Sequence, residues 1–476
     1  MSRSRKRSLF ALGGAVGLLV LVALVMPLVV DVDAYKPRVE GAASDALGMD
    51  VRIGGRLGMG FFPGFHVTVA DVRVLDEQGV AVASARRTRL WIALFPLLHK
   101  ELRLSRVELT EPRLSIERDP EGRFNVERLK KAAALLGTLH GASVSLSDGT
   151  LLYADRRSGE GFEAIGLHLK VSRMRFTEER GPGLLKGLSL GAELACGEIR
   201  TKDFSVSALK VSVRGKDGAF ELKPVTMGIF GGQVAGSLRA DVSGAVPLYQ
   251  VRCSLPGFRI EEFLKTLSPE KAAQGAMDFS ASLSMQGNTM KQMVQTAAGE
   301  VSLRGENLTL VGNDLDRRLS RFESSQNFNL VDVGAVFFAG PLGLAVTKGY
   351  NFASLFQGSG GNSEIRTLVS EWRVERGVAQ AKDVALATTE NRIALQGGLD
   401  FVNERFADVT VAVIDAGGCA RVRQAIRGSF GKPVVEKPRV LTSLAGPVLK
   451  LYKQTRDLLP AKPCEVFYSG SVVAPK

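Results

Sequence analysis

The sequence predicts a mainly β protein with short helices, carried behind an N-terminal transmembrane helix. Three observations predict this class. Residues 9–30 form an uncharged apolar run, and most of the chain after it alternates apolar and polar residues. Alternation with a period of two is typical of strands that bury one face. Helical patterns, in contrast, are few and short. The roughly 440 residues after the run suffice for two or three ordinary domains or one elongated domain.

The apolar run from Leu9 to Val30 is about as long as a helix that crosses the hydrocarbon core of a bilayer. Four cationic residues precede it and two carboxylates follow it: Arg3, Arg5, Lys6 and Arg7, then Asp31 and Asp33. Cationic flanks stay in the cytoplasm during insertion. We therefore expect a basic cytoplasmic tail at residues 1–8, a single-pass helix at 9–30, and the rest of the chain outside.

A membrane anchor has two alternatives as the role of this run. A cleaved signal peptide would use Val32 and Ala34 as the small residues of its cleavage site, but its apolar region should span only about 7–15 residues. A buried core helix would normally carry a polar stripe, and this run has none. The anchor is the favoured interpretation.

The clearest strand pattern is GAMDFSASLSM. Its apolar residues share one face and its polar residues the other: Met277, Phe279, Ala281, Leu283 and Met285 against Asp278, Ser280, Ser282 and Ser284. Elsewhere the alternation changes phase, at Glu111-Pro112 and near Arg173, which predicts β-bulges or a strand edge. Two helices stand out: a short one within Tyr35–Asp50 that ends at Gly48, and an amphipathic one at residues 439–459.

Several longer segments together resemble the AsmA family of bacterial envelope proteins. In the N-terminal part these are YKPRVEGAASDALGMDVRIGG, PGFHVTVADVRV and FPLLHKELRLSRVELTEPRLSIERDPEGRFNVERL. Further on they are IFGGQVAGSLRADV and GAMDFSASLSMQGNTMKQMVQTAAGEVSLRGENLTLVGNDLD. Each motif is only a Gly-, Leu- and polar-rich alternation, whereas their order and combination are specific.

The resemblance implies a bacterial inner-membrane protein with a periplasmic body, related to bridge-like proteins that carry phospholipid along an apolar groove. We therefore expect an elongated, twisted antiparallel β-sheet that forms a groove, with a filled β-sandwich as the alternative. The resemblance also suggests an AsmA-like β-rich domain at residues 31–140, a middle sheet region at 141–260, and a second AsmA-like domain at 261–476.

Candidate lipid-contacting residues are Met277, Phe279, Leu283 and Met285, which would line a path for acyl chains; an ordinary core is the alternative. The net charge of +13 suggests an anionic partner such as lipid headgroups, unless Lys and Arg merely solvate strand faces. Membrane phospholipids, and after them envelope proteins, are the expected partners. Nucleic acid is not expected for an exported chain.

Catalysis, cofactors and metals are not expected. The four histidines, His66, His99, His140 and His168, are scattered without the spacing of metal ligands, and no HExxH or GxSxG motif is present. Residues Gly428-Ser429-Phe430-Gly431-Lys432 only superficially resemble a phosphate-binding loop, because Pro433 stands where the Ser or Thr belongs. We expect a turn there.

The four cysteines lack CxxC spacing, so a zinc site is not expected. In an oxidising periplasm an even number invites disulfides. Cys419 and Cys464 flank the predicted terminal helix and are the favoured pair, Cys196 and Cys253 are a weaker one, and four free thiols are the alternative.

Two functions remain open from the sequence. The first is a lipid-handling protein of outer-membrane biogenesis and lipid homeostasis, whose apolar face holds acyl chains. The second is a non-enzymatic assembly or scaffold factor for outer-membrane proteins.

Overall fold

The computed structural model describes residues 32–93, 95–96, 99, 103–126, 141–176, 185–266, 273–312, 314–317, 319–320, 360–437, 439–440 and 464–475. The predicted anchor at residues 9–30 lies outside these ranges. Within them, no helix has both the length and the apolar character that a membrane crossing requires.

The described part of the chain is mainly β, with 22 strands and a few short helices. It divides into two compact units, Met1–Pro224 and Val225–Lys476. Strand β10 (Ala219–Ile229) contains the boundary. Strands β5 and β6 pair with each other, as do β12 and β14. The domain limits expected at residues 140 and 260 stay a prediction.

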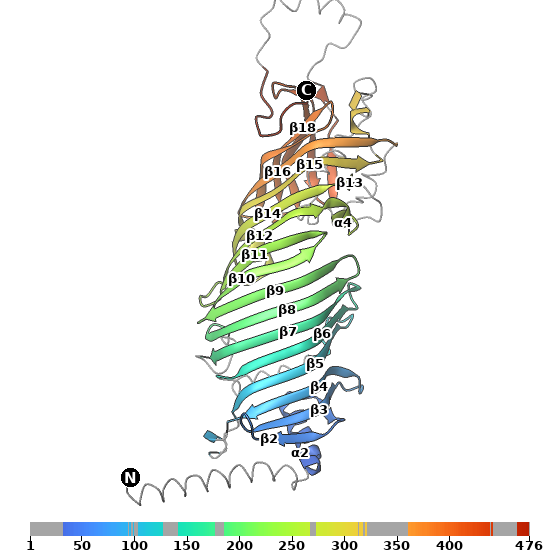
Figure 1. Cartoon of the computed structure of the whole chain (residues 1–476). Helices are drawn as coiled ribbons and strands as arrows, with labels where there is room; N and C mark the ends of the chain where they lie inside the picture. The colour runs from blue at the N-terminus through green and yellow to red at the C-terminus, as the bar shows by residue number, and fades with distance from the viewer. Residues whose placement is uncertain are drawn as a thin grey trace, which may run out of the picture. The chain divides into compact units, whose positions relative to one another are not determined.

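The first unit begins with η1 (Val32–Tyr35) and α2 (Lys36–Leu47). Nine strands follow: β1 (Asp50–Ile53), β2 (Leu57–Gly60), β3 (His66–Leu75), β4 (Ala81–Ile92), β5 (Leu104–Arg118), β6 (Ser143–Asp155), β7 (Glu160–Phe176), β8 (Leu188–Thr201) and β9 (Ser205–Lys216). In Figure 1, β3 to β9 lie side by side in chain order, from blue to green.

Helix α2 forms where the sequence predicts it and ends at Gly48, whose φ of 71° is the left-handed conformation that favours glycine. The helix is tied to β1 by two side chains. Ser44 Oγ accepts a hydrogen bond from the Val51 amide at 2.9 Å, and Glu40 Oε1 accepts one from the Ile53 amide at 2.6 Å. The chain that leaves the predicted anchor is thus fixed to the first strands.

The first unit's sheet is mixed, whereas the sequence predicted an antiparallel sheet. β5 and β6 run parallel, with Val107 opposite Val144, and the other neighbours in this unit are antiparallel. A parallel pair needs a connection long enough to return to the starting end. Residues 119–142 supply that length, and alternation patterns alone do not reveal strand direction.

The second unit continues after β10 with β11 (Gly232–Asp241), β12 (Leu248–Arg259), β13 (Ala273–Gln274), β14 (Ala276–Gln286), β15 (Ala298–Val311) and β16 (Asn362–Glu375). Then come β17 (Val378–Ala387), β18 (Arg392–Asp400), β19 (Arg405–Ile414), β20 (Ala420–Ser429), β21 (Lys432–Val435) and β22 (Arg439–Val440). The short helices are α4 (Ile260–Leu264) and α5 (Met290–Thr296). Of the helix predicted at 439–459, Arg439 and Val440 are strand instead, because they pair with β20; residues 441–459 lie outside the described ranges.

The core of the second unit lies on both faces of β16–β20. On β18, Ile393 and Leu395 belong to a large apolar cluster on one face, and Ala394 belongs to a smaller cluster on the other. The smaller cluster is rich in alanine and includes Tyr468 and Val472 of the C-terminal segment. These strands are therefore covered on their second face by an irregular segment, rather than by the second sheet of a sandwich.

Candidate functional site

One face of the first unit's sheet carries rows of apolar side chains that cross from strand to strand. In one row, the residues opposite one another on β5 to β9 are Val107, Val144, Val171, Ala192 and Val213. In the next row they are Leu109, Leu146, Leu169, Leu194 and Val211. Successive side chains on a strand point to opposite faces, so these alternate residues share one side of the sheet.

The other face of the same strands is polar. Between the two apolar rows, its row consists of Glu108, Ser145, Lys170, Glu193 and Ser212. Glu108 Oε2 also lies 3.8 Å from Arg89 Nη1 on β4. The sheet is therefore amphipathic over five strands, with one face suited to water and the other to apolar groups.

A line of kinks crosses this sheet and keeps the apolar face continuous. Residues with positive φ occur at matching points of β3, β5, β6, β7 and β9: Asp71, Glu111, Asp148, Gly166 and Ala208. On β7 the apolar face is carried by Leu167 and Leu169 on one side of the kink and by Ala164 and Phe162 on the other. The alternation of apolar and polar residues on β7 shifts by one residue at Gly166, so its apolar residues stay on one side of the sheet.

The sequence predicts two irregularities, and one of them is a bulge. It lies between Ser172 and Arg175 on β7, where the register with β8 shifts. At Glu111-Pro112 the register of β5 with β4 and β6 is unchanged, and both neighbours pair there, so the strand has neither a bulge nor a free edge. Glu111 instead has φ of 49° and an ion pair with Arg86 on β4, at 2.6 Å between Oε1 and Nη1.

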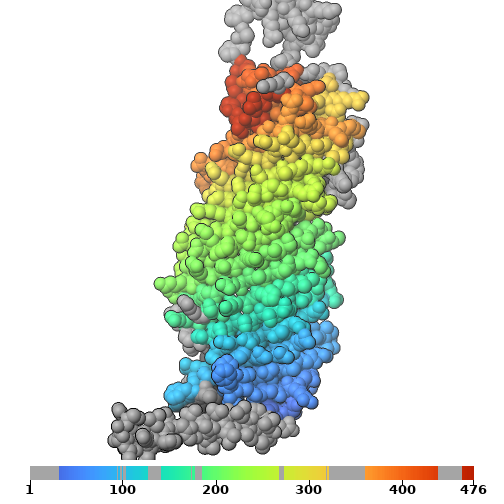
Figure 2. All heavy atoms as spheres, viewed as in Figure 1, coloured from blue at the N-terminus to red at the C-terminus, as the bar shows by residue number. Residues whose placement is uncertain are grey.

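The apolar rows on β5–β9 are only half-buried. Among their ten residues Val171 alone is buried, and the others retain exposed surface. The first unit's clusters of fully buried apolar residues, within the described ranges, lie elsewhere, on β1, β2, β3 and β4 beside η1 and α2. Figure 2 shows the blue to green strands as adjoining bands of side chains on the face in view. A contiguous exposed apolar surface usually marks a binding site.

The sequence matches a protein-family model over much of its length. The model of the AsmA family matches residues 1–177 and 183–331, which is most of the chain. The chain belongs to the AsmA family. No curated protein matches it. The AsmA match includes nearly all of the middle region, so β5 to β9 lie within the matched residues.

The second unit of this AsmA protein contains the residues that the sequence proposed as lipid contacts. All four lie on one face of β14. Met277 is 2% exposed and belongs to the large apolar cluster; Phe279 and Leu283 are half-buried and pack against that cluster; Met285 is also half-buried. Met277 is therefore a core residue, and surface that a ligand could reach remains at the other three.

Burial on this face of the AsmA chain increases from β11 toward β16. One row comprises Gly236, Cys253, Ala281, Val301 and Trp372 on β11, β12, β14, β15 and β16. The first three are half-buried, whereas Val301 is 6% and Trp372 1% exposed. The apolar face is thus accessible at one side of the unit and closed by packing at the other.

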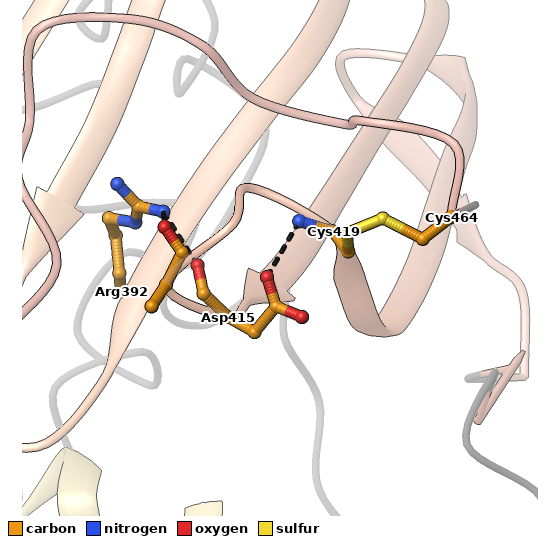
Figure 3. Close-up of a disulfide and its surroundings, with 5 residues drawn as sticks. Arg392, Asp415, Cys419 and Cys464 are labelled. Carbon is orange, nitrogen blue, oxygen red and sulfur yellow. Dashed lines mark hydrogen bonds between the residues drawn. A yellow bond between two sulfur atoms is a disulfide. The ribbon is translucent and has the colours of Figure 1, made fainter. Parts of the chain in front are cut away.

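Two of the four cysteines form a disulfide. Cys419 and Cys464 are bonded, with Cα atoms 6.0 Å apart, which is the favoured pair from the sequence. In Figure 3, the Cys419 amide donates to Asp415 Oδ1, and Arg392 reaches the carbonyl of Asp415. The bridge fixes residues 464–475 over the alanine-rich face of the second unit. This segment makes an isolated β-bridge, from Val466 to Cys419.

The second cysteine pair predicted from the sequence is wrong, because Cys196 and Cys253 are free. Cys196 on β8 lies opposite Leu167 and Leu209, and Cys253 on β12 lies opposite Gly236 and Ala281, so each packs among apolar neighbours on its own sheet. Burial raises the pKa of both thiols. Both are therefore poorer nucleophiles than an ordinary surface cysteine.

The described histidines are separate. His66 stacks on Trp91 with ring centroids 5.2 Å apart, His99 lies beside Phe95, and His168 Nε2 lies 3.4 Å from Asp148 Oδ1; His140 is outside the described residues. Across the part of the chain that the structure describes, no three His, Cys, Asp or Glu side chains are grouped as metal ligands would be. Residues 428–432 form the hairpin between β20 and β21, with Ser429 opposite Lys432, which is the expected turn.

Two cavities lie away from the apolar rows. One, of about 1150 Å³, is in the first unit among α2, the β3–β4 turn and residues 115–125, and it is lined by six carboxylates: Asp45, Asp50, Asp76, Glu77, Glu117 and Asp119. The other, of about 650 Å³, lies in the second unit between β20 and the segment that carries Cys464. Arg427 and Glu436, an ion pair at 3.2 Å, are among its lining residues.

The sequence located a candidate surface on β14 but missed the larger one on β5–β9. The signal was present, since Leu167, Leu169 and Val171 alternate with polar residues, as do Leu209, Val211 and Val213. It could not be interpreted, because alternation looks the same whether a second layer covers the apolar face or not.

Proposed function

We propose that this AsmA-family chain is an inner-membrane-anchored periplasmic protein that holds or passes phospholipid acyl chains on its apolar sheet faces. In this proposal it serves outer-membrane biogenesis and lipid homeostasis and catalyses no reaction. The observation that carries the proposal is the half-buried apolar face of β5–β9, which has nine accessible apolar residues in two adjacent rows.

The dimensions of the face suit an acyl chain. Five strands at a spacing of about 4.8 Å span about 19 Å across the sheet. One acyl chain spans about half of the hydrocarbon core, or roughly 15 Å. Each methylene group that leaves water for an apolar surface contributes about 0.8 kcal/mol. A chain lying along the rows would therefore be held by many small contributions without a specific pocket.

The packed core of the second unit leaves no room for acyl chains from β16 onward. From β16 onward the same face is filled by its own side chains, such as Leu368, Trp372 and Leu386, each at most 1% exposed. Acyl chains would have to displace a packed core there. We therefore place the lipid-holding surface on β5–β9 and on the half-buried part of β11–β14, near Phe279 and Leu283.

Site-specific photo-crosslinking in cells tests the proposal. A photoreactive residue is placed at Leu169 or Leu194 on the apolar face, and at their neighbours Lys170 or Glu193 on the polar face as matched controls. Phospholipid adducts at Leu169 and Leu194 that clearly exceed those at Lys170 and Glu193 are expected. Equal or absent lipid adducts at all four positions would reject the proposal.

The same experiment addresses the second candidate, a scaffold for outer-membrane proteins. A scaffold would give protein adducts, with no lipid preference for the apolar positions. Native mass spectrometry of the purified full chain adds an independent readout. Co-purifying phospholipid supports the first candidate, whereas a lipid-free chain that retains envelope proteins supports the second.

A further inference from the structure

The three most exposed aromatic side chains in the described part of the chain all lie within its first 95 residues. Phe62 is 89% exposed, Phe95 is 75% exposed and Tyr35 is 50% exposed. Exposing such large apolar side chains to water is unfavourable. Their clustering in one region of the sequence indicates a shared role in binding.

Phe62 and Phe95 belong to two loops at the same end of β3 and β4. The first loop, Phe61–Phe65, joins β2 to β3 and is closed by a hydrogen bond from the Gly64 amide to the Phe61 carbonyl at 3.0 Å. The second begins directly after β4. His66 lies opposite Trp91, and the Ile92 amide donates to the Phe65 carbonyl at 3.1 Å, so the loops leave the sheet side by side.

The chain enters the unit close to this end. Asp33 Oδ1 accepts a hydrogen bond from the Leu57 amide at 2.8 Å, which fixes η1 at the start of β2. Val32 packs with the small cluster of Ile53, Leu57 and Val69. The four residues of β2 cover about 13 Å, so the exit of the predicted anchor and the Phe61–Phe65 loop are near neighbours.

The two ends of β3 and β4 differ in the charge of the residues around them. At the aromatic end the polar residues include Arg103 and Arg106, and Arg106 lies over the Trp91 ring at 5.3 Å. The opposite end, at the turn after Leu75, opens on the cavity whose lining has six carboxylates and two arginines, Arg123 and Arg156, and therefore a negative net charge. Anionic headgroups attract the first arrangement and repel the second.

We infer that the Phe61–Phe65 loop and Phe95 insert into the headgroup region of the bilayer that holds the anchor, so that the first unit lies against the membrane surface. The partner is thus a phospholipid surface. Aromatic side chains favour this region because it accommodates both their apolar rings and nearby polar groups. The inference rests on the membrane anchoring in the proposed function, but it does not depend on lipid cargo.

Tryptophan quenching by brominated lipid tests the inference. The full chain has two tryptophans, which are replaced by phenylalanine; Phe62→Trp or Phe95→Trp then introduces a single reporter. Val80→Trp is the matched control, because Val80 is also exposed, at 61%, but lies at the opposite end of the same strands. The proteins are reconstituted in phosphatidylethanolamine and phosphatidylglycerol vesicles whose acyl chains carry bromine near the headgroup.

We expect at least a twofold loss of fluorescence for the reporters at positions 62 and 95, and little change for the reporter at position 80. Quenching at 62 and 95 no greater than at 80 would overturn the inference. A parallel measurement keeps Trp91, which lies next to Gly64 of this loop. In this protein only Trp372 is replaced, by Phe, and we expect brominated lipid to quench Trp91. The result does not depend on whether the chain without either native tryptophan folds correctly.

Bound cargo is distinguished from the bilayer by extraction. The reporter protein is transferred to detergent under conditions in which mass spectrometry still detects bound brominated lipid. Recovery of fluorescence at position 62 supports contact with the bilayer, and persistent quenching would overturn it. If lipid cargo is absent but quenching in vesicles is observed, the proposed lipid-holding function fails while the membrane contact stands.

Discussion

Leu169 on β7 lies directly opposite Leu194 on β8, and both side chains keep exposed surface although each is surrounded by apolar residues of the same row. The next pair, Lys170 and Glu193, has the opposite orientation and faces water. The apolar and the polar face of the sheet are thus one residue apart along each strand. Neighbouring positions therefore serve as matched variants in the tests below.

The double variant Leu169→Asp with Leu194→Asp should lose lipid while keeping its fold. Both positions are half-exposed, so the carboxylates can stay hydrated in the free protein but would have to be desolvated beneath an acyl chain. An uncompensated buried charge costs several kcal/mol, so roughly a tenfold or greater fall in lipid per protein is expected by mass spectrometry of the extracted chain.

The control for this change is Lys170→Asp on the polar face, which should leave lipid content unchanged. Circular dichroism of both variants tests folding. An apolar-face variant that is folded and carries as much phospholipid as the control would contradict the assignment of this face.

Truncation along β14 should have graded effects on stability. Met277→Ala should lower the free energy of unfolding by about 2–5 kcal/mol, because a fully buried side chain leaves a cavity. Met285→Ala should cost less, about 1 kcal/mol, since Met285 is only half-buried. Urea unfolding followed by the fluorescence of Trp372, which lies in the same cluster as Met277, measures both. Equal costs would show that Met285 is also core.

Loss of the disulfide should destabilise the second unit. The bridge closes a separation of 45 residues. The chain-entropy model gives about 4 kcal/mol for a loop of this size, and native disulfides typically contribute about 2–4 kcal/mol. We therefore expect Cys419→Ser with Cys464→Ser to lower the urea midpoint and to make residues 464–475 accessible to protease. Cys253→Ser, which removes a free thiol, is the control and should have a much smaller effect.

The C-terminal segment should loosen in acid because of Asp383. Its carboxylate accepts hydrogen bonds from the Tyr468 hydroxyl and, at 2.9 Å, from the Ser471 amide. Burial favours a higher pKa for Asp383, but these hydrogen bonds outweigh burial and the pKa is lowered. A lowered pKa stabilises the folded state above the pKa of the unfolded carboxyl, about 3.9. That stabilisation is lost as the pH falls through the folded-state pKa.

The measurement compares the native chain with Asp383→Asn in urea. Hydrogen bonds to a charged group contribute about 1.5–3 kcal/mol, so the native chain should be more stable by about that amount at pH 7. The difference should shrink as the pH falls below about 4. If the difference in the free energy of unfolding between the two proteins is the same at pH 7 and pH 3, the charge of Asp383 does not cause it.

Local features followed closely from the sequence. Gly48 ends the first helix as predicted, because a left-handed residue there suits glycine. The phase change near Arg173 predicted a bulge correctly, because an added residue shifts the alternation. At Glu111-Pro112 the phase change marks a residue with positive φ instead, and the register is unchanged. The Cys419–Cys464 pair also followed from chain order. These features depend on short stretches of chain, or on the spacing of two unusual residues.

Features that depend on distant segments did not follow. The parallel pairing of Val107 with Val144 required the path of residues 119–142, and the free state of Cys196 and Cys253 required the position of each strand in its sheet. Met277 and Met285 lie on the same face of one strand and look equivalent in the sequence. Only neighbours such as Phe258 and Gly305, brought next to Met277 by β12 and β15, make it a core residue.

The sequence by itself determined that this protein is mainly β, that its strands are amphipathic, and which residues share a face, because side-chain direction along a strand is fixed by backbone geometry. Only the tertiary structure decided which part of the apolar face is covered. Burial depends on what packs against a strand, and the segments that cover β16–β20 in the second unit, such as residues 464–475, are far from them in the chain. The rows on β5–β9 have the same alternation and remain half-exposed.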